Sequence, residues 1–313
     1  MKTIDGIVEK RVYEKLAELK NLRPISPELL GKLRSELQLE MTYNSNGIEG
    51  NSLTQKETFL VINEGITIKG KPLKDHLEAK DQQKAIDYLY GLISKNSKMD
   101  VTENLIKSFH KIVMFGSEEE ISGVYRKGSI SISGSDLIPP DGFEVPSKMN
   151  DLIIWFRKNK NNLGVIKLAA LFHHKLLMIH PFVDGNGRTA RLLLNYILMK
   201  NGFPLVVILK NDRKKYYRVL SNADKMNNDP LIKFTAQAAE RSLNIYLRAI
   251  TKSEAKKNIL MKLSVLSTKT NLSSKYLNLL VRSGKLEAVK QGRLWYSTIE
   301  SVNRYLDARE RKR

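Results

Sequence analysis

The stretch HPFVDGNGRTAR, residues 180–191, separates two apolar segments, LAALFHHKLLMI (168–179) and LLLNYILM (192–199). Both segments have the length and composition of buried helices. A turn between two helices needs one or two glycines and no arginines. This stretch instead combines a histidine, an aspartate, two glycines, an asparagine and two arginines. It therefore indicates a functional loop inside a helical core.

Helical patterns continue on both sides of this loop. The helix after the loop is expected to end at Gly202, before Pro204. Ser26 and Pro27 suit the cap and the first position of another helix. Apolar residues recur at helical spacing in residues 26–41, 75–93 and 102–116.

One segment has a different pattern. Residues 129–146 alternate at Ile130 and Ile132 and again at Phe143 and Val145, with glycines and prolines between. This pattern predicts a β-hairpin with a long polar turn. Up to about residue 250 we therefore predict a mainly α fold with one small β-hairpin.

Composition excludes several classes of chemistry. The chain has 313 residues and no cysteine, which excludes disulfides, thiol catalysis and cysteine-ligated metals. The N-terminus lacks the apolar core of a signal peptide, and no apolar run has membrane-spanning length. We therefore expect a cytoplasmic protein without membrane contact. The net charge of +20 indicates polyanionic partners such as nucleotides, nucleic acids or acidic proteins.

Residues 185–191 have the chemistry of a phosphate site. The glycines at Gly185 and Gly187 flank Asn186 where a loop meets a helix, and the unpaired N–H groups of a first helical turn bind anions. Arg188 and Arg191 are three residues apart, so both lie on one helical face and suit phosphate oxygens.

Two further residues suit catalysis beside these phosphates. Asp184 offers a hard oxygen ligand, which Mg²⁺ prefers when phosphates and waters supply its other ligands. His180 is placed to take a proton from an attacking hydroxyl. His173 and His174 are expected to pack within their apolar helix, and His110 shows no functional pattern.

The whole stretch resembles the signature of the Fic family, H-x-F-x-[D/E]-G-N-G-R-x-x-R, with every specified position filled. The resemblance extends over most of residues 1–250, and it implies transfer of AMP from ATP to a protein hydroxyl. A related phosphorylating branch, the Doc-like toxins, has Lys where Gly187 stands here, which favours nucleotidyl transfer. The implied roles are His180 as base, Phe182 as loop anchor, Asp184 for Mg²⁺, Gly185, Asn186, Gly187 and Arg188 for the α- and β-phosphates, and Arg191 for the γ-phosphate.

A second stretch, SNGIEGN (45–51), resembles the family's inhibitory pattern. Ser45 and Glu49 are four residues apart on one helical face, and Gly50 suits the end of that helix. The resemblance implies that Glu49 pairs with Arg191 and occupies the place of the γ-phosphate. The equivalent glutamate in some relatives also serves the removal of AMP, so the net direction of the reaction stays open.

The family resemblance implies two more contacts. The predicted hairpin, with Ile130, Ser131 and Ile132, resembles the flap that binds the target segment by strand addition. Tyr217 resembles a residue that stacks on adenine, and Asp224 one that reaches the base or ribose. For these residues packing without a ligand is the alternative interpretation.

The C-terminal segment is a separate basic module. Residues 252–313 contain 15 Lys and Arg against 5 Asp and Glu. Three short helical patterns, 257–267, 273–286 and 298–311, and a β-wing around Gly292 predict a winged helix-turn-helix. Such a module binds either DNA or another protein, and the sequence leaves both open.

The predicted organisation is therefore an N-terminal helical region with the inhibitory segment (1–100), a Fic core (101–250) and a winged-helix-like domain (251–313). The main hypothesis is an autoinhibited protein adenylyltransferase that uses ATP and Mg²⁺. The rival hypothesis is a DNA-binding regulator, or a toxin–antitoxin-like protein, whose Fic site only senses ATP. The identity of the target protein and the presence of a homodimer stay open.

Overall fold

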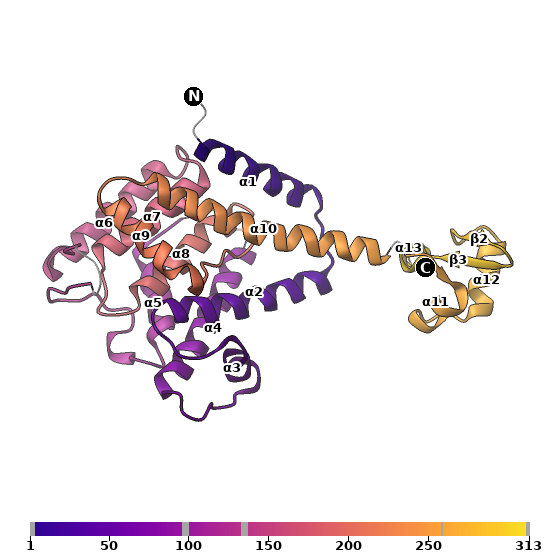
Figure 1. The fold of residues 1–313 in the computed structure, drawn as a ribbon, viewed down its shortest axis with the longest axis horizontal. Helices are drawn as coiled ribbons and strands as arrows, with labels where there is room; N and C mark the ends of the chain where they lie inside the picture. The colour runs from indigo at the N-terminus through magenta and orange to yellow at the C-terminus, as the bar shows by residue number, and fades with distance from the viewer. Residues whose placement is uncertain (1–3, 96–99, 133–136, 258, 311–313) are drawn as a thin grey trace. The chain divides into compact units, whose positions relative to one another are not determined.

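The computed structural model describes residues 4–95, 100–132, 137–257 and 259–310. It is mainly α-helical and divides into two units, Met1–Tyr246 and Leu247–Arg313 (Figure 1). None of the helices within the described ranges combines the length and hydropathy that a membrane-spanning helix needs. The mainly α fold class predicted from the sequence is confirmed.

The helices of the first unit follow the capping signals of the sequence. Ser26 caps α2 and accepts a hydrogen bond from the N–H of Leu29, and Thr102 caps α5 in the same way. The elements are α1 (Ile4–Asn21), α2 (Pro27–Ile48), α3 (Gln55–Phe59), the π-helical η1 (Leu60–Glu64), α4 (Leu73–Ser94), α5 (Glu103–Met114), the 3₁₀ turns η2 (Glu119–Ile121) and η3 (Gly142–Glu144), α6 (Val145–Asn159), α7 (Val165–Ile179), α8 (Asn186–Lys200), the 3₁₀ turn η4 (Lys210–Asp212) and α9 (Arg213–Asp224). The last helix, α10 (Asp229–Lys257), begins in this unit and continues past its end at Tyr246.

The centre of the first unit is the pair α7 and α8. Every residue of α8 from Arg188 to Met199 is buried, as expected for a helix surrounded by others. α7 packs against α8 more extensively than any other pair of described elements. The loop of residues 180–185 connects α7 to α8. It therefore lies at the N-terminus of a buried helix.

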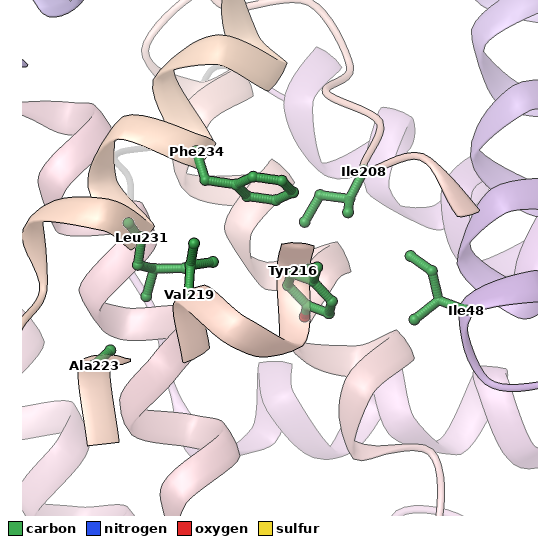
Figure 2. Close-up of a cluster of buried hydrophobic side chains, with 8 residues drawn as sticks. Ile48, Ile208, Tyr216, Val219, Ala223, Leu231 and Phe234 are labelled. Atoms are coloured by element: carbon green, nitrogen blue, oxygen red, sulfur yellow. The ribbon is translucent and has the colours of Figure 1, made fainter. Parts of the chain in front are cut away.

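A hydrophobic cluster fixes the C-terminal end of α2 (Figure 2). Ile48 packs beside Tyr216 and Ile208, together with apolar residues of α9 and α10. Each large apolar side chain buried in this way contributes roughly 1.5–3 kcal/mol to folding. Ile48 is fully buried, so its packing fixes the position of the backbone at the next residue, Glu49.

The hairpin predicted for residues 129–146 is the main error in the fold. No strand forms among the described residues of this segment; Gly142–Glu144 forms η3, and Val145 begins α6. Asp141 and Glu144 make a reciprocal capping box, and Pro146 lies in the first turn of α6, so helix-start signals override the short alternation. Residues 133–136, the centre of the predicted turn, lie outside the described ranges.

The second unit contains a small antiparallel sheet with strand order β1-β3-β2. β2 and β3 pair from Val289↔Tyr296 to Gln291↔Leu294, around Gly292 in the left-handed region (φ 60°). The helix predicted over 257–267 begins later than expected, at Leu263, and a short strand precedes it; residue 258 lies outside the described ranges. The elements are β1 (Met261–Lys262), α11 (Leu263–Lys269), α12 (Ser274–Arg282), β2 (Val289–Gln291), β3 (Leu294–Ser297) and α13 (Ile299–Glu310).

This unit has its own hydrophobic core, in which Leu266 and Leu277 of the two short helices and Val302 of α13 are fully buried. The order of two helices, a β-wing and a further helix agrees with the sequence analysis. The assignment as a winged helix-turn-helix stays a prediction.

Candidate active site

The loop of residues 180–185 is closed by its own hydrogen bonds. His180 follows α7 in the left-handed conformation (φ 49°, ψ 60°). Phe182 is fully buried, and the side-chain amide of Asn186 bonds to its backbone N–H and C=O at 3.0 and 2.9 Å. The Asn186 side chain therefore shapes the loop. A phosphate contact by Asn186 would have to use its backbone N–H, because the side-chain amide is already bonded.

Two glycines keep the start of α8 free of side chains. Gly185 has φ 75°, and a Cβ there would lie 2.6 Å from the Sδ of Met114. A Cβ on Gly187 would overlap Oε1 of Glu49 and lie 3.1 Å from Nη1 of Arg191. Because these positions lack side chains, the first-turn N–H groups of α8 can be approached closely, as the predicted anion site requires.

Both arginines of the motif are buried beside this helix N-terminus. Arg188 and Arg191 expose only 1% and 2% of their surface. Nε and Nη1 of Arg188 have no hydrogen-bond partner among the described residues, although Oε1 of Glu78 lies 3.3 Å from Nη1 and Oδ2 of Asp184 lies 3.5 Å from Nη2. A buried guanidinium with unused donors is costly unless an anion pairs with it.

The other arginine is paired with the predicted inhibitory residue. Nη2 of Arg191 donates to Oε1 of Glu49 at 2.7 Å and to the carbonyl of Ser45 at 2.8 Å, while Nε donates to Oγ of Ser45 at 3.0 Å. Glu49 is the C-cap of α2, where a carboxylate is unfavourably placed against the helix dipole. The Arg191 charge offsets this cost. Gly50 follows with φ 107° and ends the helix.

His180 is held in the form that a base requires. Its Nδ1 lies 3.3 Å from the carbonyl oxygen of Leu177. Because a carbonyl oxygen only accepts hydrogen bonds, Nδ1 carries the proton of the neutral ring, and the lone pair of Nε2 is free. Burial lowers the pKa of His180 and outweighs the hydrogen bond to the Leu177 carbonyl, which raises it; the charge of Arg126 lowers it further, and those of Glu49 and Asp184 raise it. The imidazole is therefore neutral at pH 7.

Asp184 suits a cation held mainly by phosphates. Its side chain is about half exposed; Oδ1 accepts from the N–H of Gly185 at 2.6 Å, and Oδ2 lies 3.8 Å from Nζ of Lys74. Within the described ranges no group of three or more His, Cys, Asp or Glu residues is arranged to hold a metal. Asp184 can therefore supply one ligand, as Mg²⁺ bound through phosphates requires.

His110 supports the loop, and the sequence analysis missed it. The N–H of Gly123 donates to its Nδ1 at 2.8 Å, so Nε2 carries the proton and donates to the carbonyl of Asp184, also at 2.8 Å. Its ring stacks on Phe182 at a centroid distance of 3.6 Å. No local pattern around His110 signals this contact, because its partner is 74 residues away.

The pH dependence of stability tests this role. Burial lowers the pKa of His110 to about 4, whereas an unfolded histidine titrates near pH 6.5. Between these values the unfolded chain binds a proton that the folded one does not, so stability is lost as the pH falls. We expect His110 to account for a loss of about 2 kcal/mol between pH 7 and pH 5.

Urea unfolding at the two pH values measures this loss. In a Trp295→Phe background Trp155 is the remaining tryptophan and reports on the first unit. The His110→Gln variant keeps a donor and an acceptor but does not titrate, so its stability should fall less on acidification. An equal fall in both proteins would contradict the role given to His110.

The remaining predicted residues have mixed outcomes. Oδ1 of Asp224 lies 2.8 Å from Nε2 of His174, and its contact with a base or ribose stays a prediction. His173 is buried and bonds through Nε2 to the hydroxyl of Tyr216 at 2.8 Å, so both histidines are packed as expected.

Tyr217 is 41% exposed and lies under the guanidinium of Arg213, 5.1 Å from the ring centroid. The ring of Tyr216 lies 5.6 Å away, centroid to centroid, so Tyr217 is partly packed and partly exposed.

The predicted flap residues lie in an extended segment without strand pairing among the described residues. Ser131 is exposed, and Ile130 and Ile132 are partly exposed. Arg126, at the start of this segment, is a second residue that the sequence analysis missed. Its side chain bonds to the carbonyl of His180.

Comparisons with known proteins identify the family and the fold. The sequence profile of the Fic/DOC family matches residues 100–198. A protein adenylyltransferase Fic from Nematostella vectensis is 33% identical over 252 residues, covering 80% of this chain and 58% of that protein. Fic-1 from C. elegans superimposes with a TM-score of 0.74 at 28% identity, over 80% of this chain and 74% of that one. This chain belongs to the Fic family.

A bacterial Fic structure gives the same result. A Fic-domain-containing signaling protein from Bacteroides thetaiotaomicron has a TM-score of 0.70 at 28% identity, over 78% of this chain and 97% of that one. The predicted family and Fic fold are thereby confirmed. The Fic chain described here spans about half the length of the curated relatives it matches, 58% and 44% for the first two.

Proposed function

We propose that this Fic protein is a protein adenylyltransferase, which transfers AMP from ATP to a hydroxyl group of a protein. The relatives named protein adenylyltransferase Fic support this activity. The observation that carries the proposal is the buried pair Arg188 and Arg191 at the N-terminus of α8, with the free Nε2 of a neutral His180 at the other end of the loop. Sensing ATP would require the arginines but no base.

The proposed reaction uses these groups in a fixed order. The backbone N–H groups of residues 185–187 and Arg188 bind the α- and β-phosphates, and Arg191 binds the γ-phosphate. His180 Nε2 takes the proton of the target hydroxyl as its oxygen bonds to the α-phosphorus. The bond from the α-phosphorus to the β-phosphate oxygen breaks, and pyrophosphate leaves. Positioning and charge stabilisation supply most of the catalysis. A Mg²⁺ ion bound to Asp184 and the phosphates would neutralise developing charge.

We propose that the structure is the inhibited state. The Glu49 carboxylate pairs with Nη2 of Arg191, which the γ-phosphate needs, so ATP cannot bind productively until Glu49 moves. Tyr217 is proposed to stack on adenine with its exposed face, and Ile130, Ser131 and Ile132 to bind the target segment. The same Glu49 carboxylate can position a water for removal of AMP, which makes the reverse reaction part of the proposal.

Intact-mass analysis tests the activity. The Glu49→Gly protein, incubated with ATP and Mg²⁺, should gain the mass of one or more adenylate groups by self-modification. The Glu49→Gly, His180→Ala double variant is the matched control and should gain none. A mass increase by phosphate alone, or no increase with any hydroxyl-bearing protein added, would contradict adenylyl transfer.

A specific observation favours a second function for the C-terminal unit: we propose that it binds duplex DNA. Between Lys262 and Ser297 the sequence has one acidic residue, Glu287. Glu287 pairs with Arg304 at 2.8 Å. Seven exposed cations of this segment have no ion-pair partner among the described residues: Lys262, Lys269, Lys275, Arg282, Lys285, Lys290 and Arg293.

Their placement agrees with a DNA-reading helix and wing. Lys275, Leu279 and Arg282 share one face of α12 and are exposed. Lys290 lies on β2 and Arg293 in the β2–β3 turn, so both belong to the wing. Cations without carboxylate partners suit a phosphate backbone, and an exposed apolar side chain between them suits a thymine methyl.

Fluorescence anisotropy of a labelled duplex with the full chain tests this function. Affinity should fall steeply with salt, and Lys275→Ala or Arg293→Ala should lower the slope of log K against log salt by about one. Lys225→Ala, an exposed cation of the first unit, is the control and should leave the slope unchanged. Salt-independent or absent binding would contradict the proposal and favour a protein partner.

A further inference from the structure

Arg126 has an unusual set of contacts for a buried arginine. It exposes 4% of its surface, and no carboxylate within the described ranges forms an ion pair with it. Its guanidinium instead donates to main-chain carbonyls: Nε to His180 at 2.8 Å, Nη1 to Gly128 at 2.7 Å, and Nη2 to Pro140 at 2.5 Å and to Ile179 at 3.3 Å. A buried charge saturated by carbonyls fixes the segments that carry them.

The first of these segments is the end of α7. The carbonyls of Ile179 and His180 are among the orphan acceptors of the helix C-terminus, and a cation there is favourable. His180 also has a positive φ of 49°, which costs a non-glycine residue energy unless its surroundings hold it. The backbone N–H of Arg126 adds a bond to the carbonyl of Pro181 at 3.0 Å. Arg126 thus bonds to the carbonyls of three consecutive residues, Ile179, His180 and Pro181, and fixes the backbone around His180.

The second segment is the loop that contains the predicted target-binding residues. Gly128 and Pro140 lie at its two ends, and one guanidinium joins them. The ends approach so closely that a Cβ on Gly142 would overlap the carbonyl of Lys127. The hydroxyl Oγ of Ser129 adds a bond to Oδ1 of Asp141 at 2.5 Å. The Arg126 side chain therefore bonds both to the ends of this loop and to the backbone of His180.

We propose that Arg126 is a positioning residue that joins the target-binding loop to the base, so that an incoming hydroxyl meets Nε2 of His180 in a fixed geometry. This inference rests on the proposed transfer of AMP. All side-chain hydrogen bonds of Arg126 within the described ranges go to the loop ends and to the end of α7, so it acts on the target side of the reaction and not on the nucleotide side. Its charge also favours the neutral imidazole, because Arg126 lowers the pKa of His180.

Self-modification rates and ATP affinities separate these effects in the Glu49→Gly background. We expect the rate to fall about tenfold for Arg126→Lys and about 10²-fold for Arg126→Ala, as misplacement of a reacting group does. The Kd for ATP should stay within twofold of the parent. Lys127→Ala, an exposed neighbour, is the matched control and should keep the parent rate. Thermal unfolding confirms that each variant is folded.

A readout without turnover completes the test. NMR titration of the five histidines, with His180 assigned by its loss in His180→Ala, should show a higher pKa of His180 in Arg126→Ala than in the parent. If the parent transfers no AMP, the proposed function fails, and this titration still decides the role of Arg126. An unchanged pKa of His180, a folded Arg126→Ala variant within twofold of the parent rate, or a parallel loss of ATP binding would each overturn the proposal.

Discussion

Replacing His180 with alanine is expected to reduce AMP transfer by roughly 10²–10⁴-fold, the usual contribution of a general base. The structure gives the reason: burial keeps the imidazole neutral, and the Leu177 carbonyl orients it with Nε2 free. Nucleotide affinity should be nearly unchanged, because the phosphate donors come from α8 and its arginines. Initial rates with labelled ATP and binding of an ATP analogue, both in the Glu49→Gly background, measure the two effects.

A second variant excludes a structural cause for this loss. Asparagine at position 180 can still donate to the carbonyl of Leu177, but it has no basic nitrogen. His180→Asn should therefore lose as much activity as His180→Ala while keeping the loop intact. If either variant retains nearly full activity, His180 is not the base, and the rival hypothesis of an ATP-sensing site becomes the better one.

The second large effect is expected at Glu49. Its carboxylate must leave Arg191 before the γ-phosphate can bind, and a hydrogen bond between charged groups is worth about 1.5–3 kcal/mol. Glu49→Gly removes that competition, so AMP transfer should rise roughly 10–10²-fold. Glycine is tolerated at this helix end, where Glu49 is already the cap and Gly50 follows in a left-handed conformation.

The chain offers a matched control for this gain. Glu40 is also on α2 and pairs with an arginine, Arg241, at 2.8 Å, but it lies nine residues before Glu49 and outside the phosphate site. Glu40→Gln breaks that pair and should leave the rate of transfer unchanged, whereas Glu49→Gln should raise it. Equal rates of AMP transfer for the wild type and Glu49→Gly would show that Glu49 does not inhibit the reaction.

The residues of the central loop were predictable because their chemistry is local. Glycine, arginine and aspartate within twelve residues indicate a phosphate site whatever the rest of the chain does, and the Ser45–Glu49 spacing indicates one helical face. The contact of Glu49 with Arg191 spans 142 residues. It was expected only because the family resemblance implies it.

The residues that support the loop were not predictable in this way. His110 and Arg126 lie 74 and 54 residues from the carbonyls they bind, and a lone histidine or arginine in a helical sequence has many structural roles. Glu78, which lies beside Arg188, gave no signal either. Such contacts depend on how α4 and α5 pack around α8, which no periodicity in a single sequence specifies.

The errors have a physical explanation as well. At residues 142–146 the alternation of apolar residues is only two positions long, and a capping box with a proline in the first turn outweighs it. The sequence also does not show which group of Asn186 is available to a phosphate: its side-chain amide satisfies the buried backbone of Phe182, which leaves the backbone N–H for the predicted contact. Buried main-chain groups need partners, so a loop of this kind uses a side chain for itself.

The most direct test of the central claim is a crystal structure of Glu49→Gly with Mg²⁺ and a non-hydrolysable ATP analogue. We predict the α-phosphate at the N–H groups of residues 185–187, the γ-phosphate on Arg191, and the α-phosphorus open to a hydroxyl bonded to Nε2 of His180. A triphosphate bound away from the N-terminus of α8, or bound there with its α-phosphate turned from His180, would contradict the account.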